Sequence, residues 1–485
     1  MNITDLSPAI VWKYFHEITQ VPRPSKKEGK MIQYLESFAA KHNLELKKDK
    51  SQNILIKKPA TPGKENVPVV VLQAHMDMVC EKNEGTPHDF ENDPIRTVVD
   101  DEWLKADGTT LGADNGIGMA AQLAILASDD IEHGPIECLF TVDEETGLTG
   151  ANNLETGFIT GHILLNLDSE DEGEIYIGCA GGKNTIATFE YTPHKTLTDF
   201  FFRIDIKGLN GGHSGSEIHK GLGNANKILA RILYKLVGSM ADMELCAING
   251  GNLHNAIARE AWAVIGIGSE NKELARTLIN QFTAEIEDEL KDIDSNVSIS
   301  MFSVPPVAYC IHPKVSCDLI YALMACPHGV MGMSRDIPGL VETSTNLASV
   351  KMGEDNTITV VTSQRSSVES RKEEVSSMVE AVFILADAEV SFTDGYPGWA
   401  PNTHSGILKV AQDTYKELFG KEAAIKAIHA GLECGLFLKK YPQLDMISFG
   451  PTLRDVHSPN ERIEIRTVEL WWQHLLEILK SIPAK

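Results

Sequence analysis

Basic residues are scarce in this chain of 485 residues, and long apolar runs are absent. Lysine and arginine total 44 against 68 aspartates and glutamates, a formal net charge of −24. This excess of negative charge disfavours binding to nucleic acids and to anionic membranes. No apolar run reaches the ~18 residues of a transmembrane helix, and the N-terminal segment lacks the basic start and apolar core of a signal peptide. We therefore expect a soluble cytoplasmic protein without a nucleic-acid or membrane partner.

Several motifs of other chemistries are also missing. The eight cysteines form no CxxC pair, and most lie in apolar segments such as IECLF and LMAC, which favours reduced, buried thiols. The chain contains neither a GxSxG elbow nor a GxxxxGK[ST] phosphate loop. A loose GxGxxA match begins at Gly116, but we interpret its glycines as part of the turn that presents Asp114. The sequence thus disfavours a disulfide scaffold, a serine hydrolase and a nucleotide-binding protein.

The order of the predicted elements indicates one α/β domain inserted into another. A chain of this length is too long for a single core, and glycine-rich segments, IGCAGGKNT and DGYPGWAPN, lie where it can pass between domains. We predict a mostly parallel mixed sheet with flanking helices, built from residues 1–185 and 400–485. The inserted part, residues 186–399, is predicted to be a two-lobed α/β lid.

Ionisable residues follow apolar segments at several places in the first and last parts of the chain. The segments are VVVLQAHMD, LGADNG, IECLFTVDEETG, ILLNLD and MISFGPTLRDVHSPNE. The carboxyl ends of parallel strands share one edge of a sheet, where ligands bind. Imidazole and carboxylate ligands suit Zn²⁺ first, with Mn²⁺ or Co²⁺ as alternatives. A metal site is therefore predicted from His75, Asp77, Asp114, Glu144, Glu145, Asp168 and His457.

The number of candidate ligands favours two ions. A catalytic zinc takes about three protein ligands and a water, whereas five good ligands suit two ions roughly 3.5–4 Å apart that share a carboxylate. Asp114 is the natural bridge because its tight glycine-containing loop precedes a predicted helix. Asp77, two residues after His75, can accept the imidazole N–H that faces away from the metal. Of the neighbours Glu144 and Glu145, one can bind metal while the other faces the water.

These motifs, together with GLNGGHSG and HAGLECG, resemble those of the co-catalytic zinc exopeptidases that include aminoacylase, peptidase V and the carnosinases. The resemblance covers essentially the whole chain. It implies a zinc metallo-dipeptidase with two ions, which cleaves Xaa-His dipeptides including carnosine-type substrates through a metal-activated water. It also implies residue roles: His75 and Asp168 on one zinc, Glu145 and His457 on the other, Asp114 bridging, Asp77 holding the His75 ring, and Glu144 as general base.

The predicted lid contributes further candidates. His213 lies among the four glycines of GLNGGHSG, where backbone can approach a ligand closely. The family resemblance favours His213 as a hydrogen-bond donor to the oxyanion of the reacting carbonyl. Asn255 and Arg365 resemble the family's lid asparagine and arginine, and an arginine at a strand end can bind a C-terminal carboxylate. Glu433 is a candidate partner for the substrate amine. For Asn255, Arg365 and Glu433 a purely structural role stays open.

Two other functions remain to be separated from a dipeptidase. The same residues can serve an aminoacylase-like hydrolase of N-acyl amino acids. A non-catalytic peptide-binding relative is expected to have lost a metal ligand or the base, and this chain retains all of them. For the favoured function we expect a small dipeptide as the partner and a homodimer as the assembly.

Overall fold

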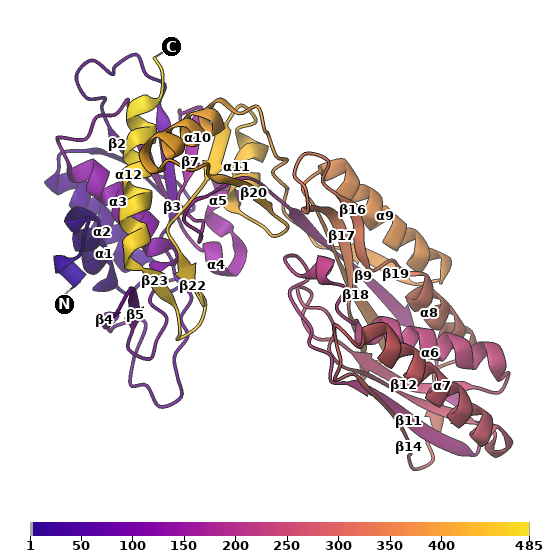
Figure 1. Ribbon diagram of the computed structural model, residues 1–485. Helices are drawn as coiled ribbons and strands as arrows, with labels where there is room; N and C mark the ends of the chain where they lie inside the picture. The colour runs from indigo at the N-terminus through magenta and orange to yellow at the C-terminus, as the bar shows by residue number, and fades with distance from the viewer. Residues whose placement is uncertain (1–2, 485) are drawn as a thin grey trace. The chain divides into compact units, whose positions relative to one another are not determined.

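The computed structural model describes residues 3–484, which form two compact units (Figure 1). Unit 1 comprises the chain up to Gly178, Pro401–Ala427 and the chain from Leu432 onward. Unit 2 comprises Cys179–Ala400 and Ile428–Gly431. The assignment of Ile428–Gly431 to unit 2, between two segments of unit 1, was not predicted. It follows from backbone pairing, since the N–H of Ala180 donates to the carbonyls of Ile428 and Ala430, both at 3.0 Å.

Unit 1 is built on an eight-stranded sheet in the order β1-β2-β6-β3-β7-β21-β8-β20. Its central strands β6, β3, β7 and β21 are parallel, and antiparallel pairs flank them. Every residue of β3 and β6 is buried, as expected of apolar strands covered on both faces. The predicted mixed sheet is therefore confirmed. Its strands are β1 Glu45–Lys48, β2 Ile54–Lys58, β3 Val70–His75, β6 Ile136–Thr141, β7 Ile163–Asn166, β8 Glu174–Cys179, β20 Ala424–Ile428 and β21 Asp445–Ser448.

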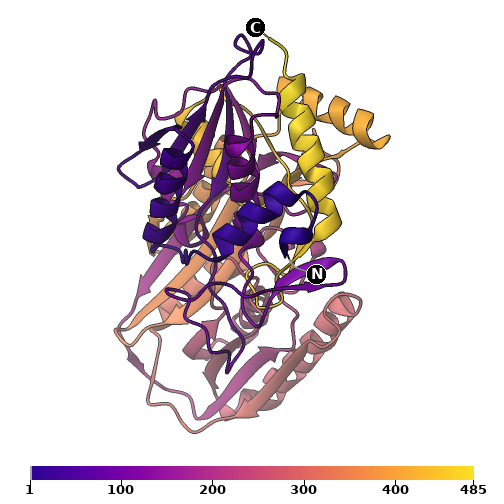
Figure 2. The ribbon, with the colours of Figure 1, turned by 90° about the vertical axis from the view of Figure 1, so that its left-hand side faces the viewer.

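Helices flank this sheet, with α3 packed on β3, α1 on α3, and α10 on both β21 and α12. Figures 1 and 2 show α1, near the N-terminus, beside the C-terminal α12, and Ser7 Oγ donates to Glu469 Oε1 at 3.2 Å. The helices are η1 Ile3–Asp5, α1 Ala9–Thr19, α2 Gly29–Lys41, α3 Ala113–Ala127, α4 Glu144–Gly147, α5 Thr149–Asn153, α10 Gly406–Phe419, α11 Glu433–Lys440 and α12 Ile465–Ser481. A small sheet, β22-β23-β5-β4, consists of β4 Thr97–Asp100, β5 Trp103–Ala106, β22 Leu453–Arg454 and β23 Arg462–Glu464.

Unit 2 contains a nine-stranded sheet in the order β14-β11-β13-β12-β17-β18-β9-β19, with β16 on β17. The pairing of β12 with β17 joins the two predicted lobes into one continuous sheet. Its strands are β9 Gly181–Glu190, β11 Phe200–Lys207, β12 Glu244–Gly250, β13 Ala261–Ile267, β14 Ser298–Ser303, β16 Gly329–Met333, β17 Val341–Met352, β18 Thr357–Ser366 and β19 Glu389–Phe392. A separate pair is formed by β10 His194–Lys195 and β15 Tyr309–Cys310.

The helices of unit 2 share its hydrophobic core with the sheet. Ile218 starts only a short 3₁₀ turn. The α-helix begins at Ala225, where the Asn224 side chain accepts hydrogen bonds from two backbone N–H groups of the first turn. The helices are η2 Ile218–Lys220, α6 Ala225–Ser239, η3 Ser269–Asn271, α7 Lys272–Leu290, α8 Pro313–Ala325 and α9 Glu369–Leu385.

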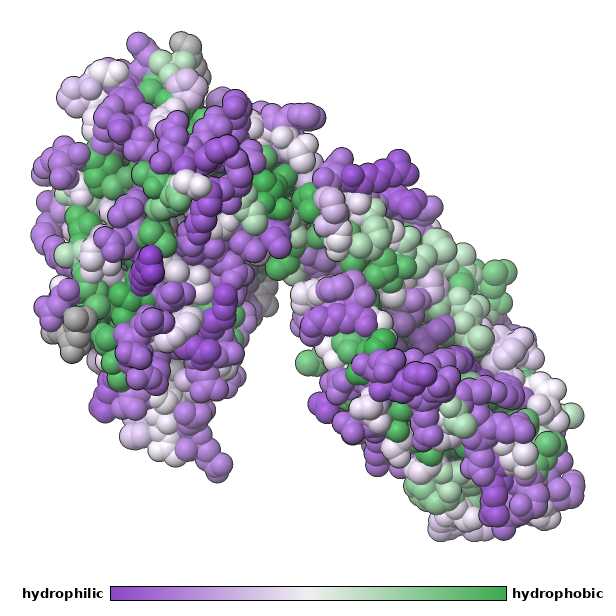
Figure 3. All heavy atoms as spheres, viewed as in Figure 1, coloured by the Kyte–Doolittle hydropathy of each residue, from purple (hydrophilic) through white to green (hydrophobic). Residues whose placement is uncertain are grey.

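Hydrophilic residues cover much of the face of each unit that Figure 3 shows, with apolar residues between them. Apolar side chains are exposed on α8 and α9, among them Tyr321, Met324, Ile384 and Leu385. Within residues 3–484, no helix combines the length and apolar character needed to cross a bilayer.

Candidate metal centre

Three central strands of unit 1 bring predicted ligands to one edge of the sheet. His75 is the last residue of β3, and Asp168 lies two residues beyond the end of β7. Glu144 and Glu145 follow β6 and begin the one-turn helix α4. Because these strands are parallel neighbours, their carboxyl ends meet at the same edge.

Asp114 reaches the cluster from a different element than expected. We predicted a tight loop that follows an apolar strand and precedes a helix. Asp114 does lie in such a turn at the start of α3, with non-helical φ and ψ of −81° and 112°, but no strand of the large sheet leads into it. The preceding strand, β5, belongs to the small sheet. The strand was wrongly predicted because a short apolar segment rich in glycine does not distinguish a strand from the start of a buried helix. His457 comes from the loop between β22 and β23, where its φ is 60°.

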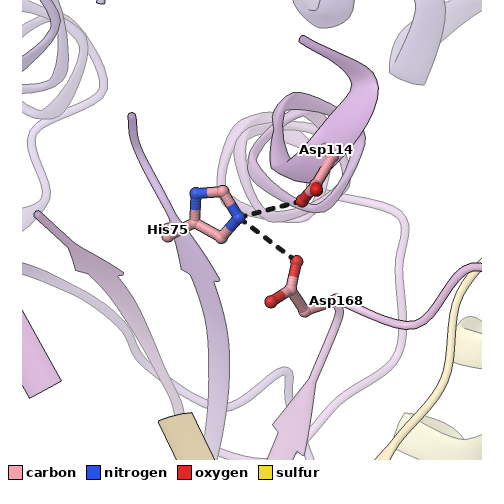
Figure 4. Close-up of side chains that lie close together, drawn as sticks. All are labelled: His75, Asp114 and Asp168. Carbon is pink, nitrogen blue, oxygen red and sulfur yellow. Dashed lines mark hydrogen bonds and ion pairs between the residues drawn. The ribbon is translucent and has the colours of Figure 1, made fainter. Parts of the chain in front are cut away.

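The two carboxylate oxygens of Asp114 face two different histidines. Nε2 of His75 lies 2.9 Å from Asp114 Oδ1 and 3.4 Å from Asp168 Oδ1 (Figure 4). Nε2 of His457 lies 3.2 Å from Asp114 Oδ2 and 3.0 Å from Glu145 Oε2. The side chains therefore form two adjacent groups that share Asp114, and within each group one potential ligand atom per residue lies within 4.8 Å of the others.

The chemistry of this cluster suits divalent cations. Burial and the charges of Asp114 and Glu145 raise the pKa of Asp168 to about 7, against the opposing effect of His75. Hydrogen bonds to Asp114 and Glu145 raise the pKa of His457 to about 11. Among the described residues, the buried Oε1 of Glu145 has no hydrogen-bond partner. Crowded carboxylates and a buried oxygen without a partner are unfavourable unless a positive charge lies between them, so these residues can hold metal ions.

Asp77 connects the end of β3 to the two glutamates. Its side chain is fully buried, and its carboxylate accepts the backbone N–H groups of Glu144 at 3.0 Å and Glu145 at 3.2 Å, and the Ser25 hydroxyl at 2.8 Å. Nδ1 of His75 lies 3.4 Å from Asp77 Oδ1 and 3.2 Å from the Asp77 carbonyl oxygen. Asp77 therefore lies where it can orient both the histidine and the start of α4.

Glu144 lies beside the cluster in a half-buried position. Burial raises the pKa of its carboxyl well above the ordinary value, with Asp168 and Glu433 adding to the shift against the effect of His75. A carboxylate of this kind accepts a proton more readily than an exposed one, as a general base requires. Distances alone do not separate Glu144 from Glu145 as a ligand, because both can lie within 4.8 Å of His75.

Glu433 is the first residue of α11 and is 1% exposed. Its Oε2 accepts hydrogen bonds from Gln73 Nε2 at 2.6 Å and from Thr141 Oγ1 at 2.9 Å. Its buried Oε1 has no hydrogen-bond partner among residues 3–484. Burial raises the pKa of this carboxyl to about 8. The free oxygen leaves Glu433 available to a ligand donor, although the side chain is closed to bulk solvent.

The remaining predicted residues, His213, Asn255 and Arg365, lie in unit 2. Nδ1 of His213 accepts hydrogen bonds from the N–H groups of Gly215 at 3.2 Å and Ser216 at 3.1 Å. The proton of a neutral ring is therefore on Nε2, and burial, with the nearby charge of Arg365, lowers the pKa of His213. The backbone carbonyl of Asn255 accepts from Ser214 N at 2.8 Å, which places Asn255 beside the His213 loop.

Arg365 lies near the end of β18 and is 6% exposed. Its Nη1 donates to the Tyr396 hydroxyl at 2.8 Å, and its buried Nε has no acceptor among the described residues. A guanidinium that is held on one side and free on another can bind a carboxylate.

Sequence reasoning missed two buried charged residues next to the ligands, Arg23 and Glu461. Arg23 donates to the carbonyl oxygen of Asp77 at 2.5 Å and also to that of Gly112. Glu461 accepts from backbone N–H groups around Gly112. Glu461 belongs to the HSPNE motif, which was singled out for His457 and gave Glu461 no role. No local pattern in the sequence identified Arg23.

Comparison with known proteins places this geometry in a family. The model of peptidase family M20/M25/M40 matches residues 71–481. The cytosol non-specific dipeptidase of Escherichia coli (strain K12) is 43% identical over 485 residues, 100% of both chains. The crystal structure of aminoacylhistidine dipeptidase from Vibrio alginolyticus is 45% identical and superposes with a TM-score of 0.94, covering 100% of this chain and 99% of that one. An aminopeptidase from Bacillus cereus ATCC 10987, with 16% identity, a TM-score of 0.58 and coverage of 98% and 99%, shares the fold. The predicted family resemblance is confirmed: this chain belongs to peptidase family M20/M25/M40.

Proposed function

We propose that this peptidase is a two-metal dipeptidase that hydrolyses Xaa-His dipeptides, carnosine-type substrates included. The observation that carries the proposal is the position of Asp114, whose two oxygens face His75 and His457 at 2.9 and 3.2 Å. The substrate class is supported by the full-length relatives that are named as a cytosol non-specific dipeptidase and an aminoacylhistidine dipeptidase.

In this proposal the two groups of side chains each hold one ion, with Asp114 between them. His75 and Asp168 bind the first ion, and Glu145 and His457 bind the second. Nitrogen and oxygen ligands of this kind favour Zn²⁺, with Co²⁺ or Mn²⁺ as alternatives. Bound ions of this type lower the pKa of a water and polarise a carbonyl group.

Glu144 takes up the proton that the attacking water loses and delivers it to the leaving amine. Its half-buried position beside the cluster and its raised pKa support that role. Asp77 acts through other residues, because its carboxylate holds the N–H groups of Glu144 and Glu145 and faces the His75 ring. His213 donates from Nε2 to the developing oxyanion, and the two hydrogen bonds accepted by its Nδ1 support that tautomer.

Residues that bind the two charged ends of the substrate would explain selection for dipeptides. Arg365 has a free Nε for the C-terminal carboxylate, and Glu433 has a free Oε1 for the N-terminal amine. Asn255, beside the His213 loop, is a further contact. We propose residues 186–399 as the lid, and residues 1–185 and 400–485 as the metal-binding catalytic domain.

The proposal also covers the location of the enzyme in the cell and its oligomeric state. The name of the relative from E. coli supports a cytoplasmic location, and a homodimer is our prediction for the assembly. Sedimentation of the purified protein measures the assembly directly, and a mass of one chain would contradict the dimer.

A substrate panel tests the proposed function. Chelator-treated protein is reloaded with Zn²⁺, Co²⁺ or Mn²⁺ and assayed on an Xaa-His dipeptide, carnosine, N-acetylhistidine and a tripeptide that ends in histidine. We expect cleavage of the dipeptides and much slower turnover of the other two, because N-acetylation removes the charged amine and the longer peptide moves it. Faster hydrolysis of N-acetylhistidine would favour the amidohydrolase, and tight binding without turnover would favour a non-catalytic relative.

A further inference from the structure

One buried carboxylate accepts hydrogen bonds from four consecutive backbone N–H groups of the segment that ends at Asp114. Oε2 of Glu461 accepts from Leu111 N at 2.8 Å and from Gly112 N at 3.0 Å. Oε1 accepts from Ala113 N at 2.8 Å and from Asp114 N at 3.3 Å. Glu461 is 2% exposed. Each carboxylate oxygen thus serves two neighbouring donors, away from competing solvent.

The segment cannot satisfy these donors locally. The first N–H groups of an α-helix have no partner within the helix, and a side chain at the N-cap normally accepts one of them. Here the N-cap is Gly112, which has no side chain and a φ of 69°. Asp114 departs from helical geometry as well. The acceptor comes instead from Glu461, which lies 347 residues after Asp114 in the chain.

Arg23 holds the same segment from its carbonyl side. Its guanidinium donates to the Gly112 carbonyl and to the carbonyls of Met76 and Asp77, just beyond His75. A Cβ atom at Gly112 would lie only 2.6 Å from Nη2 of Arg23. The segment is therefore fixed between a buried cation and a buried anion, and Arg23 ties it to the end of β3.

Glu461 also shares a loop with one of the candidate ligands. His457 lies four residues before it in the HSPNE motif, and Nε2 of His457 lies 3.2 Å from Asp114 Oδ2. The loop between β22 and β23 therefore supplies both a histidine that faces the Asp114 side chain and a carboxylate that binds the Asp114 backbone.

We propose that Glu461 is a positioning residue of the metal centre, which fixes the backbone of Asp114 so that its two carboxylate oxygens face His75 and His457 at once. The inference rests on the proposed two-metal function. It assigns Glu461 no contact with substrate or metal. A helix cap with no further role would affect unfolding and leave the affinities for the two ions unchanged.

Glu461→Gln tests this role, because an amide of nearly the same shape replaces one acceptor oxygen by a donor. Glu464→Gln is the matched control: Glu464 lies in β23, three residues further along, and pairs with Trp103 through its backbone. Chelator competition measures the affinities for the first and the second Co²⁺ ion. The visible absorption of the bound cobalt and the kcat and KM for an Xaa-His dipeptide are measured on the same preparations. We expect Glu461→Gln to weaken ion binding by about 10–100-fold and to lower kcat by about 10–100-fold, a range typical of mutations in residues that orient metal ligands. The cobalt absorption should change and KM should change less than kcat, whereas Glu464→Gln should match the wild type.

Unchanged cobalt affinities and absorption in Glu461→Gln, with only a lower unfolding temperature, would contradict the inference and leave Glu461 as a structural cap. If Glu461→Gln does not fold, Glu461→Asp keeps the charge on a shorter side chain and should fold with weakened ion binding. Failure of both variants to fold would assign Glu461 to the fold and overturn the positioning role. Wild-type protein that binds no pair of ions or cleaves no dipeptide would instead overturn the proposed function, and this inference with it.

Discussion

Glu144→Gln is expected to lower kcat by about 10²–10⁴-fold, the usual range for the loss of a general base. The amide cannot take a proton from the attacking water, yet it has nearly the same size and can occupy the same half-buried position. Metal content and the unfolding temperature should therefore stay close to those of the wild type. Steady-state kinetics on an Xaa-His dipeptide, with metal analysis of the same preparation, measure both effects.

Glu84→Gln is the matched control, because Glu84 is an exposed glutamate of unit 1 outside the candidate site. It should keep wild-type turnover. Near-normal kcat in Glu144→Gln would remove Glu144 from the mechanism. Loss of an ion in Glu144→Gln would indicate that Glu144 is a ligand, an arrangement that distances alone leave open.

His213→Ala is expected to lower kcat by about 10²–10³-fold, as typically follows removal of one oxyanion donor. The substrate oxygen becomes anionic only in the transition state, so turnover should fall more than substrate affinity. Both ions should remain bound, because His213 belongs to unit 2 and the candidate ligands to unit 1. The role requires the inserted unit to meet the metal centre during turnover.

Single-turnover kinetics make this test decisive, because lid closure or product release can limit kcat and mask a change in the chemical step. His219→Ala is the control, since His219 is an exposed histidine in the same region of the chain. An unchanged chemical step in His213→Ala would reduce His213 to a loop residue and contradict its proposed role as a donor.

The sequence best predicted those site residues that neighbouring parallel strands bring together. His75 ends the apolar strand β3, and Glu145 and Asp168 follow the apolar strands β6 and β7. A buried strand has a clear local pattern, and the ends of parallel neighbours meet without any further information. The chemistry of these residues and their order in the chain could therefore be read before the structure.

Long-range contacts could not be predicted in the same way. Asp114 lies in a turn at the start of α3 and not after a strand of the large sheet, and the backbone of this turn is hydrogen-bonded by Arg23 and Glu461, which lie far away in the chain. The pairing of β12 with β17 joined two apparent lobes into one sheet. Such contacts arise from tertiary packing, which leaves no periodic or local signal in the sequence.

Metal titration of the chelator-treated protein tests the central claim most directly. Bound ions and activity on an Xaa-His dipeptide are measured together as Co²⁺ or Zn²⁺ is added. We expect two ions per chain, with full activity only after the second. The side chains of His75 and His457 are 1% and 51% exposed, respectively, so the ion at His457 should exchange more readily with solvent. Full activity at one ion per chain, with no gain from a second, would contradict a centre bridged by Asp114.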